Sequence, residues 1–303
     1  MQITSHILMI RPVDFKFNTQ TAGNNKFQQV SVQQDVQQQA LREFDDFAAL
    51  LRKNGVDVTV IDDTPDPETP DSIFPNNWIS FHENGEVYLY PMYAENRRPE
   101  RRQDILDILG RKFRIGRVTD LSGYEAQEQY LEGTGSMVLD RENKIAYACL
   151  SLRTSQEVLA DFCNRSGYLP VAFSAADANG FPIYHTNVMM CIGSSFAVVC
   201  LDALPDTADR QKVASSIQAS GKTLLPISLE QMNHFAGNML EIKNNAGEHL
   251  LVMSAQALRS LRPEQVGQLE LQGRIISPAL YVIEQNGGGS ARCMLAEIHL
   301  DER

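Results

Sequence analysis

Short apolar runs, each preceded by a small or polar residue, recur along the chain. Five segments share this pattern: FPNNWISF (74–81), GTGSMVLD (133–140), HTNVMMCI (185–192), AGNMLEIK (236–243) and ARCMLAEI (291–298). When the segments are aligned, the equivalent positions are Asn77, Ser136, Asn187, Asn238 and Cys293. They recur about every 50 residues, which indicates an internal fivefold repeat.

Each of the first four runs passes through a turn into a second strand-like run. The second runs are VYLYPM (87–92), IAYACLSL (145–152), FAVVCLDAL (196–204) and HLLVMS (249–254). Two such runs joined by a short polar turn are typical of a β-hairpin. We expect the fifth run to pair instead with SHILMIRP (5–12), which would close a circle.

Helical patterns separate the hairpins. The longest, residues 32–55, has apolar residues at helical spacing and ends at Gly55. Shorter ones cover 98–110, 155–167, 206–221 and 263–273. The repeat is therefore a hairpin plus a helix, and it predicts an α/β (α+β) fold in which five units form a closed ring. The five aligned positions would then converge on a central pocket, whereas an ordinary α/β sheet is the alternative.

Composition narrows the class of protein. The 303 residues, 43% of them hydrophobic, suffice for a sizeable core, and we expect one catalytic domain over 1–303. A net charge of −11 disfavours nucleic acid and anionic membranes as partners. No signal peptide or transmembrane run is evident. The five cysteines have no metal-binding spacing, so we expect a reduced, cytoplasmic protein without a metal site.

Cys293 is the cysteine with a polar, glycine-rich surrounding sequence. It follows NGGGSAR, where Gly287 to Gly289 allow a sharp turn or a close backbone approach. A cysteine at the end of such a loop is well placed as a nucleophile. The other four cysteines lie in apolar runs or on a helix pattern, where a buried structural thiol is the usual outcome.

His185 and Asn187 form an H-x-N pair at the expected start of a strand. Residues two apart share one face of a strand, so both side chains could point into the same pocket. A lone histidine is more often structural, but His185 stands in the repeat segment that matches that of Cys293, two residues before the aligned Asn187. Glu132, in LEGTGS, could orient this imidazole or bind a cation, although a solvated loop residue is the simpler reading.

Two further segments supply polar side chains. PDSIFPNNW contains Asp71, Asn76 and Asn77, which ordinary turn chemistry would also explain. NRRPERR contains Arg97 and Arg98, either of which could bind a carboxylate with two hydrogen bonds or simply face solvent.

Together these segments resemble the guanidine-modifying enzymes of the pentein fold, a five-bladed β/α propeller, over essentially the whole chain. PDSIF (70–74) and the following polar pair resemble the first substrate-binding motif of that family, which implies substrate contacts from Asp71, Phe74, Asn76 and Asn77. LEGTG, YHTN and the loop before Cys293 resemble its acidic, histidine and nucleophile motifs, and RRPE resembles its arginine segment. Within the family, RPVDFKFNTQTAGNNKFQ (11–28), FPNNW and YPMYAENRRPERR (90–102) are most similar to bacterial citrulline-utilisation hydrolases.

One departure from the family bears on the substrate. Arginine deiminases, which belong to the family that this chain resembles, carry acidic residues at the positions of Asn77 and Asn187. Carboxylates suit a cationic guanidinium, whereas an amide can both donate and accept and suits a neutral ureido group. This favours citrulline, although Asp71 and Glu132 could still accommodate a cation.

The resemblance implies a mechanism that needs no cofactor. Cys293 attacks the central carbon of the ureido or guanidino group, and His185 protonates the departing amine and then activates a water. Glu132 orients His185 or binds a substrate N–H, the polar residues hold the head group, and Arg97 or Arg98 binds the α-carboxylate. Citrulline would yield ornithine, ammonia and carbon dioxide.

Other functions stay open. An arginine deiminase or dimethylarginine-type hydrolase would release citrulline, an amidinotransferase would pass the group to an amine, and a non-catalytic pentein would only bind a partner. We expect a small amino-acid substrate and a possible homodimer. The polar segment 14–25 is either a lid over the pocket or an ordinary surface loop.

Overall fold

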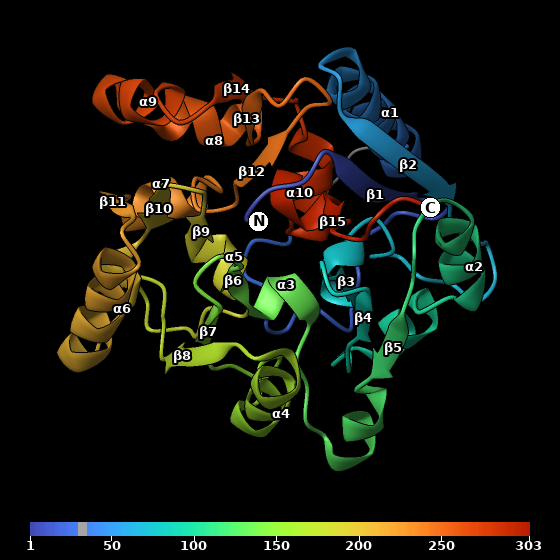
Figure 1. Cartoon of the computed structure of the whole chain (residues 1–303), viewed down its shortest axis with the longest axis horizontal. Coiled ribbons are helices and arrows are strands. Elements are labelled where there is room, and N and C mark those ends of the chain that lie inside the picture. Colours follow the sequence, from blue (N-terminus) through green and yellow to red (C-terminus); the bar gives the residue numbers. More distant parts are fainter. Residues whose placement is uncertain (30–34) are drawn as a thin grey trace.

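The structure, a computed structural model, describes residues 1–29 and 35–303. Within these ranges the strands form five three-stranded sheets that stand around a common centre like propeller blades (Figure 1). The strands are β1 (His6–Arg11), β2 (Asp57–Asp62), β3 (Ile79–Phe81), β4 (Glu86–Leu89), β5 (Arg117–Asp120), β6 (Val138–Asp140), β7 (Ile145–Cys149), β8 (Leu169–Phe173), β9 (Met190–Ile192), β10 (Phe196–Val199), β11 (Thr223–Pro226), β12 (Leu240–Lys243), β13 (His249–Val252), β14 (Arg274–Ile276) and β15 (Ala296–Glu297). The predicted α/β propeller with a fivefold repeat is confirmed.

The blades share one strand order. Four of them are β3-β4-β5, β6-β7-β8, β9-β10-β11 and β12-β13-β14, and the fifth is β15-β1-β2. In each blade the first two strands are antiparallel and the third is parallel to the second. The fifth blade joins the two ends of the chain, with Ile7 opposite Glu297 and Leu8 opposite Ala296, as the sequence predicts.

The third strand of each blade is absent from the predicted hairpin-plus-helix unit. These strands lie on the outer side of the blades, and their hydrophobic pattern is weak because few of their residues are buried. In β5 only Thr119 is buried, and in β8 only Phe173. A parallel partner that follows a helix also lacks the tight turn that identifies a hairpin.

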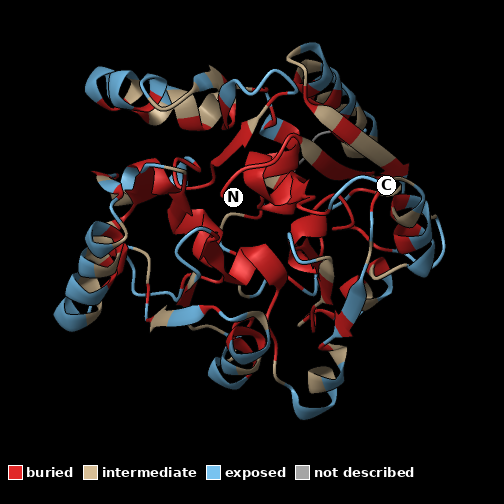
Figure 2. Ribbon diagram, viewed as in Figure 1, coloured by how far each residue is buried: buried red, intermediate tan, exposed pale blue. Residues whose placement is uncertain are grey.

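Helices cover the outside of the ring, and the buried residues concentrate at its centre (Figures 1 and 2). The α-helices are α1 (Val36–Lys53), α2 (Gln103–Lys112), α3 (Gly133–Ser136), α4 (Gln156–Ser166), α5 (Thr186–Met189), α6 (Thr207–Ala219), α7 (Leu229–Asn233), α8 (Ala255–Ser260), α9 (Pro263–Glu270) and α10 (Tyr281–Gly287). The 3₁₀ helices are η1 (Pro75–Asn77), η2 (Glu95–Glu100), η3 (Ser122–Gln127), η4 (Leu201–Ala203) and η5 (Ala291–Met294). The five predicted helices are confirmed as α1, α2, α4, α6 and α9. Residues 32–34 of the first lie outside the described ranges.

Helix α1 shows why these patterns fold as they do. Its apolar residues Phe44, Phe47 and Leu51 recur at helical spacing and are fully buried. The helix ends where Gly55 takes a φ of 82°, a conformation that favours glycine. No helix in residues 1–29 and 35–303 is long and apolar enough to cross a membrane.

Most of the aligned repeat positions lie in single helical turns before the first strand of a blade, not on the strands themselves. Asn77 ends η1, Ser136 ends α3, Asn187 is in α5 and Cys293 is in η5. The strand geometry expected for His185 and Asn187 is therefore wrong, because His185 directly precedes the helical turn that contains Asn187. The turns carry these side chains to the inner end of each blade.

Candidate active site

A small, partly open pocket lies among these helical turns, with about 260 Å³ of empty space that includes open solvent. The residues that line it are Asn25, Asp71, Phe74, Asn77, Arg97, Arg153, Tyr184, His185, Gly287, Gly289 and Cys293. Six of the ten residues predicted for the site are therefore in its wall. Three more, Glu132, Asn76 and Asn187, are buried and form hydrogen bonds with residues of this wall.

Glu132 and His185 form the central pair of the site. Nε2 of His185 lies 2.7 Å from Oε2 of Glu132, and the other carboxylate oxygen accepts the backbone N–H of Tyr93 at 3.0 Å. Arg153 Nη1 lies 3.5 Å from the same Oε2. Because the carboxylate can only accept, the neutral imidazole donates from Nε2 and keeps Nδ1 as a free acceptor.

The pKa values of the pair are shifted in the same direction. Burial lowers the pKa of His185 to about 4, and the hydrogen bond that His185 donates to Glu132 offsets only part of that effect. Burial alone would raise the pKa of Glu132, but the charge of Arg153 and the hydrogen bond to His185 outweigh it and hold the pKa at about 2. At neutral pH the pair is thus a carboxylate and a neutral imidazole, which suits a proton acceptor.

The sulfur of Cys293 lies between two amide donors. Nδ2 of Asn187 is 3.4 Å from Sγ, and Nδ2 of Asn238 is 3.3 Å from it. Asn238 also bonds the carbonyl of Asn187 and the N–H of Arg292, which fixes its orientation. Two N–H donors at this position stabilise the negative charge of a thiolate.

Arg97 is a buried structural partner of the pocket and does not present a free guanidinium to it. Its Nε and Nη2 bond the carboxylate of Glu100 at 2.8 and 2.9 Å. Its Nη1 donates to Oδ1 of Asn77 at 2.8 Å, and Nη2 also approaches the carbonyls of Asp71 and Phe74. Since the oxygen of Asn77 accepts from Arg97 and one N–H of its Nδ2 donates to Asn76, the second N–H of Nδ2 is the part that remains for a ligand.

Asp71 retains one free oxygen. Oδ2 accepts from Asn18 Nδ2 at 2.8 Å and from Thr21 Oγ1 at 3.3 Å, whereas the buried Oδ1 has no partner in the described residues. Burial raises the pKa of this carboxyl despite the nearby charges of Arg97 and Arg153. Oδ1 of Asn187 is likewise buried and unpartnered. The oxygens of Asp71 and Asn187 are therefore two acceptors that a ligand could satisfy.

Phe74 and Asn76 shape the pocket in different ways. The ring of Phe74 packs so tightly on the glycine-rich loop that a Cβ on Gly287 or Gly289 would lie within 2.9 Å of it. Oδ1 of Asn76 accepts the amide of Asn77 at 3.1 Å. Arg98 points away from the pocket: its Nε donates to the carbonyl of Met92 at 3.2 Å and lies near carboxylates on the surface.

The glycines of LEGTG allow the site to assemble. A Cβ on Gly133 would lie 2.3 Å from the carbonyl oxygen of Asn76, and one on Gly135 would lie 2.3 Å from Nδ2 of Asn77. The same Cβ on Gly135 would also lie 2.8 Å from Nδ1 of His185. Glycine is therefore needed at position 135, because Asn77, which precedes β3, and His185, which precedes β9, both contact this position.

Four contributors are missing from the predicted set: Arg153, Tyr184, Asn25 and Asn238. Asn238 carries a usable signal, because it occupies the repeat position equivalent to Cys293. Arg153 is a lone arginine in a loop, and its bonds to Thr21 and Asn24 depend on a segment more than a hundred residues away. Such long-range contacts leave no local pattern.

Part of the polar N-terminal segment covers the pocket. Asn18 bonds Asp71, as described above, and Asn25 Nδ2 lies 3.4 Å from the carbonyls of Gly287 and Gly288. The placement agrees with a lid, but whether the segment opens stays a prediction.

One cluster outside the pocket has suitable atoms for a metal ion. The ligand atoms of His6, Asp57 and Glu302 lie within 4.8 Å of one another. Lys112 Nζ contacts Asp57 and lies 3.5 Å from Glu302, so its ammonium already supplies the positive charge.

Comparison with known families agrees with this architecture. Residues 11–300 match the family model described as N,N dimethylarginine dimethylhydrolase, eukaryotic. The chain belongs to this family of pentein guanidino-modifying hydrolases. This pentein is accordingly a cysteine-dependent hydrolase of C–N bonds in guanidino-type groups, as the sequence predicts. Comparison with curated proteins gave no match.

Solved structures share the pentein fold at low sequence identity. The N-terminal domain of ArgZ, an arginine dihydrolase of Cyanobacteria, is 16% identical with a TM-score of 0.74, and the match covers 97% of each chain. An AgrE variant in complex with L-arginine is 15% identical with a TM-score of 0.73, covering 97% of the pentein studied and 40% of AgrE. A dimethylarginine dimethylaminohydrolase adduct with S-methyl-L-thiocitrulline is 16% identical with a TM-score of 0.66, covering 98% and 100% of the two chains.

Proposed function

We propose that this pentein hydrolyses the ureido group of citrulline through a covalent intermediate on Cys293. The observation that carries the proposal is the donor and acceptor inventory of the pocket. The side-chain oxygen of Asn77 accepts a hydrogen bond from Arg97, and an N–H of the same amide is available to donate to the ureido oxygen. Asn187 and Asp71 each offer an unpartnered oxygen, which suits the ureido N–H groups.

The charges of the pocket support a neutral head group. Both oxygens of Glu132 are engaged by His185, Arg153 and Tyr93, so this carboxylate is not free to bind a guanidinium. Asp71 lies 3.9 Å from Arg97, which compensates part of its charge. A buried guanidinium would therefore find one partly compensated carboxylate, and leaving a buried cation incompletely paired is costly.

The chemistry follows from the free nitrogen of His185. Nδ1 accepts the thiol proton as Cys293 attacks the ureido carbon, and the amides of Asn187 and Asn238 stabilise the developing thiolate. His185 then gives the proton to the departing ammonia. A water, deprotonated by the same nitrogen, attacks the thioester-like intermediate and releases a carbamate. The carbamate decomposes to ornithine and carbon dioxide, so one citrulline and one water yield ornithine, ammonia and carbon dioxide.

Arginine is the second candidate substrate. The free Oδ1 of Asp71 is the observation that favours it, and the similar ArgZ structure is that of an arginine dihydrolase. Hydrolysis of arginine by the same cysteine would release ammonia and citrulline.

An assay of L-citrulline and L-arginine side by side, with Cys293→Ala as control, tests the proposal. We expect ornithine and ammonia from citrulline, little turnover of arginine and none by the variant. Citrulline formed from arginine would transfer the assignment to the second candidate, and full activity of Cys293→Ala would refute the mechanism.

A further inference from the structure

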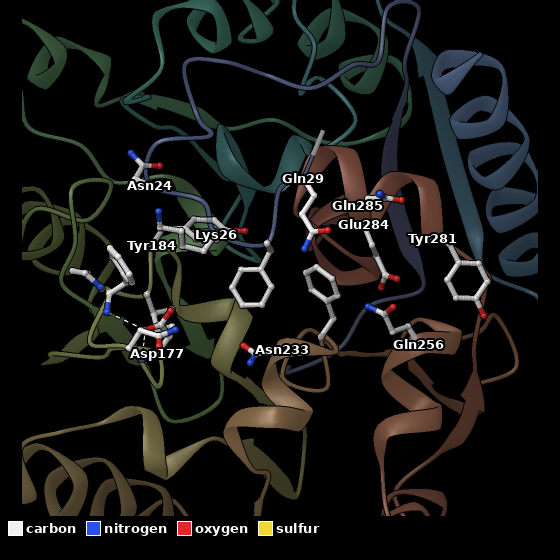
Figure 3. A pocket seen from close by; sticks show the side chains of 16 residues that line it. Asn24, Lys26, Gln29, Asp177, Tyr184, Asn233, Gln256, Tyr281, Glu284 and Gln285 are labelled. Carbon is white, nitrogen blue, oxygen red and sulfur yellow. Dashed lines mark hydrogen bonds between the residues drawn. The ribbon is translucent and has the colours of Figure 1, made fainter. Parts of the chain in front are cut away.

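A second, larger hollow, whose lining residues are drawn in Figure 3, shares Tyr184 with the lining of the catalytic pocket. It holds about 1460 Å³ of empty space, compared with about 260 Å³ in the pocket, and both volumes include open solvent. Tyr184 lines both spaces, and its hydroxyl donates to the carbonyl of Gly288 at 2.6 Å, so its ring is part of the wall between them. Side chains of the 24–29 segment form another wall.

Glu284, on α10, is the unusual group in this hollow. Its side chain is 2% exposed and points into the space from the helix, near Gln256 (Figure 3). Oε1 accepts the hydroxyl of Ser290 at 2.6 Å, but Oε2 has no hydrogen-bond partner in residues 1–29 and 35–303. A buried carboxylate oxygen without a donor is rare, because it loses its hydration without compensation.

The electrostatic surroundings compensate the same carboxylate only in part. Glu284 forms no ion pair with any of the described residues. Burial raises the pKa of Glu284 to about 7, the nearby hydroxyls of Ser254 and Ser290 lower it in part, Glu43 on α1 adds a further increase, and the charge of Arg259 lowers it slightly. A cation placed at Oε2 would supply both the missing donor and the missing charge.

The opposite side of the hollow carries a positive charge on Lys26 beside the carboxylate of Asp177, whose Oδ1 accepts the backbone N–H groups of Asn179 and Phe181. Lys26 lies across the space from Glu284 (Figure 3), with Nζ 4.5 Å from the centre of the Phe181 ring, and it forms no ion pair within the described residues. Amide side chains, among them Gln256 and Gln285, line the intervening surface. A ligand with a cation at one end and a carboxylate at the other matches this arrangement.

We propose that the hollow is a second binding site, separate from the catalytic pocket, for a small basic amino acid whose ammonium or guanidinium group binds Oε2 of Glu284. Lys26 faces the carboxylate of this ligand. The site lies next to the nucleophile loop, since Ser290 bonds Glu284 through its hydroxyl and accepts the N–H of Cys293 through its carbonyl at 3.0 Å. The inference stands on geometry that does not depend on the substrate of the catalytic pocket.

Isothermal titration of the full chain with L-ornithine tests the site. We expect two classes of sites in the wild type and the loss of one class in Glu284→Gln, with at least about tenfold weaker binding there, because the substitution keeps the shape and removes the charge. Glu264→Gln, an exposed acid on α9, is the matched control and should bind as the wild type does.

A second variant separates this site from the catalytic one. Asp71→Asn alters the catalytic pocket, and the Glu284-dependent class should persist in it whether or not citrulline proves to be the substrate. Identical ornithine isotherms for wild type and Glu284→Gln would overturn the proposal. So would the disappearance of every binding event in Asp71→Asn.

Discussion

Oε2 of Glu132 lies 2.7 Å from Nε2 of His185, and both side chains are almost completely removed from solvent. The contact fixes the imidazole so that Nδ1 is the nitrogen available for proton transfer. In Glu132→Gln the amide can hold the ring in place but cannot stabilise an imidazolium. We expect kcat to fall about 100-fold or more. Steady-state kinetics check this, and Glu128→Gln, an exposed acid, should retain wild-type rates.

The same pair predicts a loss of stability in acid. The pKa of His185 is about 4 in the folded protein, below its ordinary value of 6.5, because burial disfavours the charged ring. The unfolded chain therefore binds the proton more tightly, and the free energy of unfolding falls as the pH drops from about 6.5 to 4. The loss is about 3 kcal/mol for this residue.

His82 and His299 are also buried with lowered pKa values, so they add to the loss of stability in acid. A variant is therefore needed to isolate the contribution of His185. His185→Gln keeps a donor toward Glu132 but does not titrate. Urea unfolding at several pH values should show the wild type losing stability relative to the variant below pH 6.5. Parallel curves for the two proteins would contradict the assignment of the low pKa to His185.

Asn77 is expected to determine the choice between ureido and guanidino groups. Its oxygen is held by Arg97, so Asn77→Asp would replace the remaining N–H group by an acceptor and add a negative charge. We expect kcat/KM for citrulline to fall at least about tenfold and the ratio of arginine to citrulline turnover to rise. Competition assays with both substrates measure that ratio, and the exposed Asn84→Asp should leave it unchanged.

Gly135 offers a test of the close approach of two blades. The Cβ of Gly135→Ala would meet Asn77 and His185 at less than 3 Å, so either the pocket or the backbone must shift. We predict loss of most activity and a lower free energy of unfolding. Gly267→Ala is the control, because a Cβ in α9 would have no neighbour within 4 Å and alanine favours a helix by about 1 kcal/mol. Equal behaviour of the two variants would contradict this view.

The sequence predicts the fivefold ring because the repeated element is local: an apolar run, a turn and a second run. Closure between β1 and β15 follows from the fifth run, which lacks a hairpin partner of its own. The outer strands are not predicted, because few of their residues are buried and each of them follows a helix instead of a tight turn. The same limit applies to Arg153, whose position in the pocket depends on contacts with the distant 21–24 segment.

Arg97 illustrates a different limit. The sequence indicates an arginine near the pocket but not that Glu100, three residues later, engages its guanidinium. The helical turn of η2 brings the two together and converts an expected carboxylate-binding residue into a support for Asn77. The residue type indicates which ligand an arginine could bind, but the residues that already engage its guanidinium determine whether it can bind one.

The covalent state of Cys293 during turnover tests the proposed mechanism most directly. Wild-type enzyme is mixed with L-citrulline, quenched in acid within the first turnovers and analysed by peptide mass spectrometry. The proposed mechanism predicts that the peptide containing Cys293 gains the mass of citrulline less ammonia, and that Cys293→Ser gains none under the same conditions. An unmodified Cys293 peptide while ornithine accumulates, or an adduct on another of the five cysteines, would contradict it.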